Sequence, residues 1–146
     1  MFQHYADRGV FRGFSASDAP RRRRQYRFVW LTRRPMLVSL APERGVLTFA
    51  RLFPSVAMTP GVAATLKQAL ARSASRGLPA HRRLDPRHAT IAGRVASGDL
   101  SVHVTIHAPD GARAIRAALS IVNDLFQILH ECYPDYLSAQ FGVADE

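Results

Sequence analysis

The 146-residue sequence contains a single cysteine, Cys132, and a single lysine, Lys67. One cysteine cannot form an intramolecular disulfide and cannot by itself hold a zinc ion, so disulfide and zinc scaffolds are excluded. The chain also lacks any run of about 18 apolar residues, the length needed to cross a bilayer, and residues 1–10 lack the apolar run of a signal peptide. We therefore expect a soluble, cytoplasmic protein with no membrane partner.

Sequence motifs of known enzymes are also missing. The chain has no paired carboxylates, no Gly-x-Ser-x-Gly turn, no phosphate-binding loop and no dinucleotide-binding glycine pattern. Asp85 and Asp99 lie in predicted turns and Asp110 at a predicted helix start, where such residues serve structure. Cys132 lies at the end of a predicted helix, where the helix dipole disfavours a thiolate nucleophile. We expect a protein that is not an enzyme and that uses no cofactor or metal.

The composition indicates a globular domain with a basic surface. Hydrophobic residues make up 47% of the chain, which is enough for one buried core, and the formal net charge is +9. Nearly all of the basic residues are arginines, a bias that a GC-rich genome produces without selection for binding. The arginine excess lies in residues 1–109, whereas residues 110–146 hold more carboxylates than arginines. This polarity favours head-to-tail contacts or a partner of opposite charge.

The N-terminal segment differs from the rest of the chain. Residues 1–25 contain glycines, a Ser-Ala-Ser-Asp-Ala-Pro stretch and the run Arg21–Arg24, with no sustained helical or strand period. We expect a mostly mobile arm here, followed by one domain at residues 26–146. The four aromatic residues of the arm have two possible docking sites, the domain itself or a partner.

Three apolar segments bounded by turn residues predict strands at residues 26–32, 36–41 and 46–53. Thr59 and Pro60 then predict a helix start, with Thr59 as the capping residue and Pro60 at the first helical position. Gly77 suits the end of this helix.

A hairpin is predicted from two further strands, at residues 88–95 and 100–107. Apolar and polar residues alternate in both, and pairing Val95 with Leu100 brings the apolar residues of the two strands onto one face. The alternation therefore fixes the register of this hairpin.

A long amphipathic helix is predicted at residues 110–133. Its apolar stripe repeats at helical spacing from Ile115 to Tyr133, and Pro134 ends the pattern. Residues 135–143 form a short tail whose aromatic and leucine side chains would cover the end of the core.

The resulting order of elements, β-β-β-α-β-β-α, predicts an α+β fold. In it an antiparallel sheet of about five strands carries its helices on one face. This order, together with Leu78-Pro79 after the first helix, the strand-turn-strand of residues 89–106 and the long helix at 112–133, resembles the YbjN-like family. That family is in turn similar to type III secretion chaperones. The resemblance implies a small homodimer that binds other proteins and catalyses no reaction. Such chaperones usually begin with a helix and are usually acidic, whereas this chain begins with an arginine-rich segment and is basic. Because of its positive charge, this chain would suit an acidic partner.

One candidate surface lies on the polar face of the predicted hairpin. The register places His88 across from His107, with His103 nearby on the same strand. No cysteine or carboxylate of that face completes a set of metal ligands. We therefore interpret the face as a contact surface for a protein partner, formed by His88, His103, Thr105 and His107.

A second candidate surface is basic and supports an alternative function, the binding of single-stranded nucleic acid. Guanidinium groups pair with phosphates, and aromatic rings stack on unpaired bases. Tyr26, Phe28 and Trp30 alternate with the basic residues, although Phe28 and Trp30 would equally suit the core. The arginines of this set are Arg21, Arg22, Arg23, Arg24, Arg27, Arg33 and Arg34.

Overall fold

A six-stranded antiparallel sheet forms the centre of the computed structural model, which describes residues 2, 11–19, 23–31, 34–41, 45–74, 89–107 and 111–141. The strands are β1 (Arg12–Ala19), β2 (Arg23–Val29), β3 (Pro35–Ala41), β4 (Val46–Phe53), β5 (Ala89–Ala96) and β6 (Asp99–Ile106). Their order in the sheet is β1-β2-β3-β4-β6-β5. The predicted α+β class with an antiparallel sheet is confirmed, and the predicted number of five strands is wrong.

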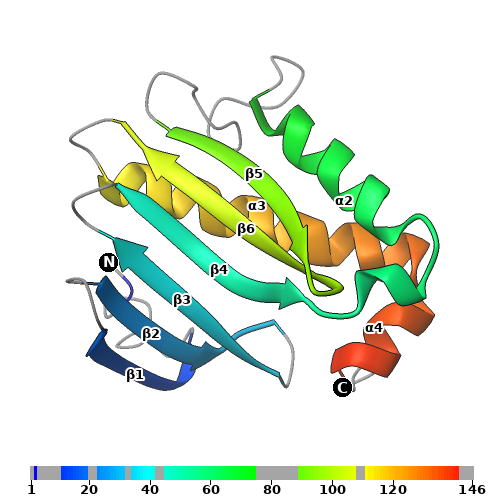
Figure 1. The fold of residues 1–146 in the computed structure, drawn as a ribbon, viewed down its shortest axis with the longest axis horizontal. Helices are drawn as coiled ribbons and strands as arrows, with labels where there is room; N and C mark the ends of the chain where they lie inside the picture. The colour runs from blue at the N-terminus through cyan, green and yellow to red at the C-terminus, as the bar shows by residue number, and fades with distance from the viewer. Residues whose placement is uncertain are drawn as a thin grey trace.

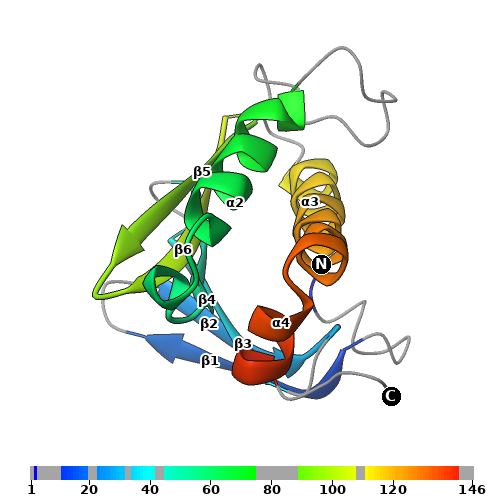
Figure 2. The same ribbon diagram turned by 90° about the vertical axis from the view of Figure 1, so that its right-hand side faces the viewer.

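The helices cover one side of this sheet, as Figures 1 and 2 show. They are α2 (Val62–Ala71), α3 (Gly111–Cys132) and α4 (Pro134–Phe141), with the 3-10 turns η1 (Val56–Met58) and η2 (Arg72–Ala74) beside α2. Within the described ranges, no helix has both the length and the apolar character needed to cross a membrane.

The additional strand is β1, which lies in the segment that we expected to be a mostly mobile arm. Its residues include glycine, serine and aspartate, which are poor strand formers and hide the strand in the sequence. The strand pairs with β2 from Ser15 to Ala19 in regular register, and a β-bulge precedes this part of the ladder. β2 also begins earlier than predicted, at Arg23. Pairing with β2 therefore stabilises a strand that local propensity does not predict.

The hairpin of β5 and β6 has the predicted register. Val95 pairs with Leu100, and at the other end Ala89 pairs with Ile106. β6 then pairs with β4, which joins the hairpin to the N-terminal strands. The prediction succeeded here because one face of both strands is apolar, so a shift of one residue would expose it.

The start of α2 differs from the prediction. The helix begins at Val62, after Gly61 with a positive φ of 90°, and no side chain caps it. The Thr59 carbonyl, rather than its side chain, accepts a hydrogen bond from the Val62 N–H at 3.3 Å. A Cβ atom at Gly61 would lie 2.6 Å from the Tyr133 hydroxyl oxygen. Close packing of Tyr133, which lies between α3 and α4, against this turn therefore favours glycine at the helix start.

The core lies between the sheet and the helices. On α3 the predicted stripe is buried from Ile115 to Leu129, and Tyr133 is half-buried. The segment predicted as a short tail forms α4, where Tyr136 and Phe141 are buried. The largest fully buried side chains include Phe28, Phe49, Phe53, Leu47, Leu66, Leu100, Leu125 and Leu129.

Candidate protein-binding face

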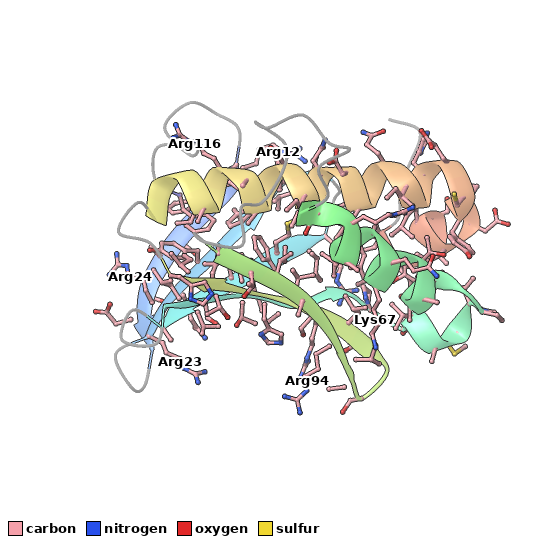
Figure 3. The ribbon with its side chains drawn as sticks, turned by 90° about the horizontal axis from the view of Figure 1, so that it is seen from above. Arg12, Arg23, Arg24, Lys67, Arg94 and Arg116 are labelled. Atoms are coloured by element: carbon pink, nitrogen blue, oxygen red, sulfur yellow. The ribbon has the colours of Figure 1, made fainter. Side chains whose placement is uncertain are left out.

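The side of the sheet opposite the helices is called the open face here. Side chains alternate along a strand, so the neighbours of buried residues such as Met36 and Val38 point to this side. Figure 3 shows Arg23 and Arg94 on this side, directed away from the helices, and Arg116 on α3 at the opposite side. By this alternation the open face contains Ser15, Ser17, Arg23, Gln25, Arg27, Val29, Leu37, Ser39, Ala41, Val46, Thr48, Ala50, Thr90, Ala92, Arg94, Ala96, Asp99, Ser101, His103 and Thr105.

The strand register arranges these side chains in rows across the sheet. One row crosses all six strands and consists of Ala92, His103, Thr48, Ser39, Gln25 and Ser17. All of its side chains are small or medium in size, and none is a carboxylate, a lysine or an arginine. Within it the Thr48 Oγ1 and the His103 Nδ1 form a hydrogen bond of 3.1 Å. The middle of the open face is therefore a flat surface of short, mostly polar side chains.

The neighbouring row carries the apolar and cationic groups. Leu37 pairs with Ala50 on one side and with Arg27 on the other, and Arg94 pairs with Ser101 near the far edge of the sheet. The side chain of Leu37 is 53% exposed, which is unusual for a leucine inside a strand. This row therefore presents an exposed aliphatic side chain next to an arginine.

The charge on the open face is positive. Arg23, Arg27 and Arg94 are exposed, and no carboxylate within the described ranges forms an ion pair with them. Asp99 lies at the start of β6, where its Oδ1 accepts a hydrogen bond from the Ser55 N–H at 2.9 Å. By contrast, Arg24 pairs with Asp18 at 3.0 Å, on the other side of the sheet by strand alternation.

His103 is the titratable group near the middle of this face. Partial burial lowers its pKa, and the positive charge of Arg94 lowers it further. The ring is therefore neutral at neutral pH, and it either donates a hydrogen bond to Thr48 or accepts one from it.

The predicted partner-binding residues lie partly on the open face. His103 and Thr105 are half-buried on β6 and belong to it, and His107 is exposed just after the strand. His88 lies outside the described residues. The part of the chain that the structure describes holds no group of three or more potential metal ligands.

The predicted arginine set is divided between surfaces. Arg23 and Arg27 belong to the open face, Arg24 points to the other side, and Arg34 is exposed just before β3. Arg21, Arg22 and Arg33 lie outside the described residues. The described arginines therefore do not form one continuous basic surface.

The aromatic residues of this segment lie on the helix side of the sheet. Phe28 is fully buried, with its ring centroid 4.0 Å from that of Phe11. Tyr26 stacks on Phe2 at 4.7 Å, and Trp30 packs edge-on against Phe11 at 5.6 Å. Phe28 and Trp30 therefore belong to the core, as one of the two interpretations expected. The aromatic residues of the N-terminal segment that the structure describes dock on the domain itself.

Sequence reasoning did not assign Leu37 or Arg94 to a binding surface. The signal for Leu37 was present, because it alternates with Met36 and Val38, which are buried. A shallow cleft lined by Thr59, Cys132, Asp135 and Gln140, among others, was also not predicted. Because its ionisable groups form no recognisable catalytic set, the open face is the better candidate site.

Together these features define an α+β domain with one open sheet face. Comparison of the chain with known protein families, with characterised proteins and with solved structures finds no significant match. The resemblance to the YbjN-like family therefore stays a prediction.

Proposed function

We propose that this chain is a non-enzymatic protein-binding module, chaperone-like in the sense of the YbjN-like resemblance, that docks its partner on the open face. The observation that carries the proposal is the exposed Leu37 beside Arg27, in a face whose other side chains are mostly small. Protein interfaces have apolar centres, are enriched in arginine and are depleted of lysine, aspartate and glutamate. The described strand residues of the open face include Arg23, Arg27 and Arg94, no lysine and no glutamate, and Asp99 is their single carboxylate.

The alternative, a single-strand nucleic-acid binder, has less support. Such proteins gain about 1–3 kcal/mol for each base that stacks on an aromatic ring. The rings of Tyr26, Phe28 and Trp30 pack on the helix side, and the described positions of the open face carry no phenylalanine, tyrosine or tryptophan. Phosphate groups would pair with the arginines but would leave Leu37 without an apolar contact.

Selection of peptides tests the proposal and does not require the partner to be identified first. A random peptide library is panned against the purified full chain, and the affinity of the selected peptides is measured by fluorescence anisotropy. We expect L37D to weaken binding by about tenfold or more, as for a residue at the centre of an interface. M58D is the matched control, because Met58 is 78% exposed and lies on η1, away from the open face.

Two results would contradict the proposal. One is an equal loss of affinity in L37D and M58D, and the other is a failure to select any peptide. Labelled oligothymidine is measured in parallel over a salt series, because phosphate contacts produce a steep fall of affinity with salt. Tight oligothymidine binding that is insensitive to L37D would replace the proposal with the nucleic-acid alternative.

The proposal includes a homodimer, as the resemblance implies. Light scattering of the purified chain over a range of concentrations is expected to give twice the monomer mass of 16.2 kDa. A constant mass equal to one chain would contradict the homodimer. It would not bear on the proposal that the open face binds a partner.

A further inference from the structure

The cations of the open face lie on both sides of its exposed leucine. Arg27 on β2 is the direct cross-strand neighbour of Leu37 on β3. Arg94 lies on β5, at the far edge of the sheet, and four strand intervals separate β2 from β5 in the order β2-β3-β4-β6-β5. At about 4.8 Å for each interval, the two strands are about 19 Å apart. Arg23 lies four residues before Arg27 on the same strand and extends the first positive group.

Among the residues that the structure describes, these arginines differ in charge compensation from a neighbouring arginine of the same sheet. Arg24, also on β2, has its charge matched by Asp18 across the strand pair. Arg23, Arg27 and Arg94 form no such ion pair with a carboxylate in the described ranges. The positive potential of the open face is therefore directed to solvent, where it favours carboxylates of a binding partner.

We propose that the open face binds an acidic polypeptide segment that places an apolar side chain against Leu37 and carboxylates against Arg27 and Arg94. This inference rests on the proposed function and specifies the chemistry of the partner. The apolar contact supplies burial, and arginine forms bidentate hydrogen bonds with carboxylates. The segment runs across the strands, because the two cationic groups share the open face but lie on β2 and β5, toward opposite edges of the sheet.

Nucleic acid is the other class of anion that arginines attract. The observations favour a polypeptide, because Leu37 offers an aliphatic contact and the row of Ser39, Thr48 and His103 presents short polar side chains where stacking would need rings. A polypeptide can contact Leu37 with an apolar side chain and can form hydrogen bonds with the row of short polar side chains through its backbone amides.

Two labelled peptides test this inference. Each has a central leucine with acidic or neutral flanks of equal length, one peptide carrying glutamates and the other glutamines at the same positions. We expect the glutamate peptide to bind the wild-type chain about tenfold more tightly at low salt, since the charge pairs between its glutamates and the arginines are then least screened. Raising the salt concentration should reduce this preference, because exposed charges are screened.

Variants then locate the preference. The double variant R27A/R94A should bind both peptides equally, with the affinity for the glutamine peptide unchanged, which also shows that the variant is folded. R72A/R116A removes the same charge from exposed arginines of η2 and α3 and should keep the preference. If R72A/R116A loses the preference to the same extent, then net charge explains it and the inference is overturned.

The outcomes separate this inference from the proposed function. If the wild type binds the two peptides equally and L37D binds neither, the inference of an acidic partner is overturned, and the proposal of a protein-binding open face still stands. Binding of neither peptide would contradict both proposals. Tighter binding of oligothymidine than of either peptide, abolished in R27A/R94A, would show that nucleic acid is the ligand of these arginines.

Discussion

Removal of a single hydroxyl group should measurably destabilise the fold. Tyr136 on α4 is buried, and its hydroxyl donates a 2.6 Å hydrogen bond to the Pro54 carbonyl, just after β4. The variant Y136F keeps the ring, which packs edge-on against Phe141 at 6.4 Å, and removes the donor. A buried acceptor left without its donor costs about 1–3 kcal/mol. For a chain of this length we expect Tm to fall by about 3–10 °C.

Urea unfolding followed by circular dichroism measures this loss. The midpoint should fall with an unchanged slope, because the surface exposed on unfolding stays the same. Y133F is the matched control, since the Tyr133 hydroxyl forms a longer 3.3 Å hydrogen bond with Thr65 in a half-buried place. We expect that control to lose less than about 1 kcal/mol. A wild-type midpoint in Y136F, or an equal loss in Y133F, would refute this reasoning.

The same hydroxyl predicts a pH dependence. Burial raises the pKa of Tyr136 in the folded chain. The unfolded chain has the ordinary tyrosine pKa of about 10. The stabilisation is therefore complete below about pH 10 and is lost as the pH rises above it, because the unfolded state releases the proton first. Y136F should show a shallower alkaline loss of stability than the wild type, and equal slopes would contradict the assignment.

Three further predictions concern stability. F11A should lower the free energy of unfolding by about 3–5 kcal/mol, because Phe11 is buried in the aromatic cluster of the N-terminal strands; a loss below about 1 kcal/mol in urea would contradict that packing. G45A should be more harmful than G98A: both glycines have a positive φ, but a Cβ at Gly45 would lie 2.7 Å from the Ile106 carbonyl oxygen, whereas nothing lies within 4 Å at Gly98. Equal urea midpoints for the two would argue against the clash. Because burial lowers the pKa of His103 in the folded chain, stability should fall as the pH drops below about 6.5, where the unfolded chain takes up the proton; H103Q should reduce this loss, and an unchanged pH profile would count against the assignment.

Several elements of the fold were predictable because their signals are local. The hairpin of β5 and β6 has the register expected from Val95 and Leu100, since alternation within a dozen neighbouring residues fixes which side is apolar. The long helix α3 is predictable from its 3.6-residue period for the same reason. His103 and Thr105 were assigned to a polar face by the same alternation, and they lie on the open face.

Other elements depend on contacts between distant parts of the chain. β1 has weak strand propensity and is stabilised by its ladder with β2 and by the burial of Phe11 beneath the sheet. The start of α2 at Val62 follows from the approach of Tyr133 to Gly61. The residues around Thr59 carry no information about Tyr133, which lies after α3 in the chain. The predicted cap at Thr59 was therefore wrong.

Local patterns in the chain predict the α+β class, most of the elements, and which residues of each predicted strand share a side. Packing between distant segments establishes which side of the sheet is covered and which residues meet on the other. Alternation places Leu37 opposite Met36, but the packing of α2 and α3 against one face leaves the leucine exposed. Arg27 and Arg94 come to share a face because β4 pairs with β6. That pairing joins segments separated by a whole helix, and no local pattern of side chains encodes it.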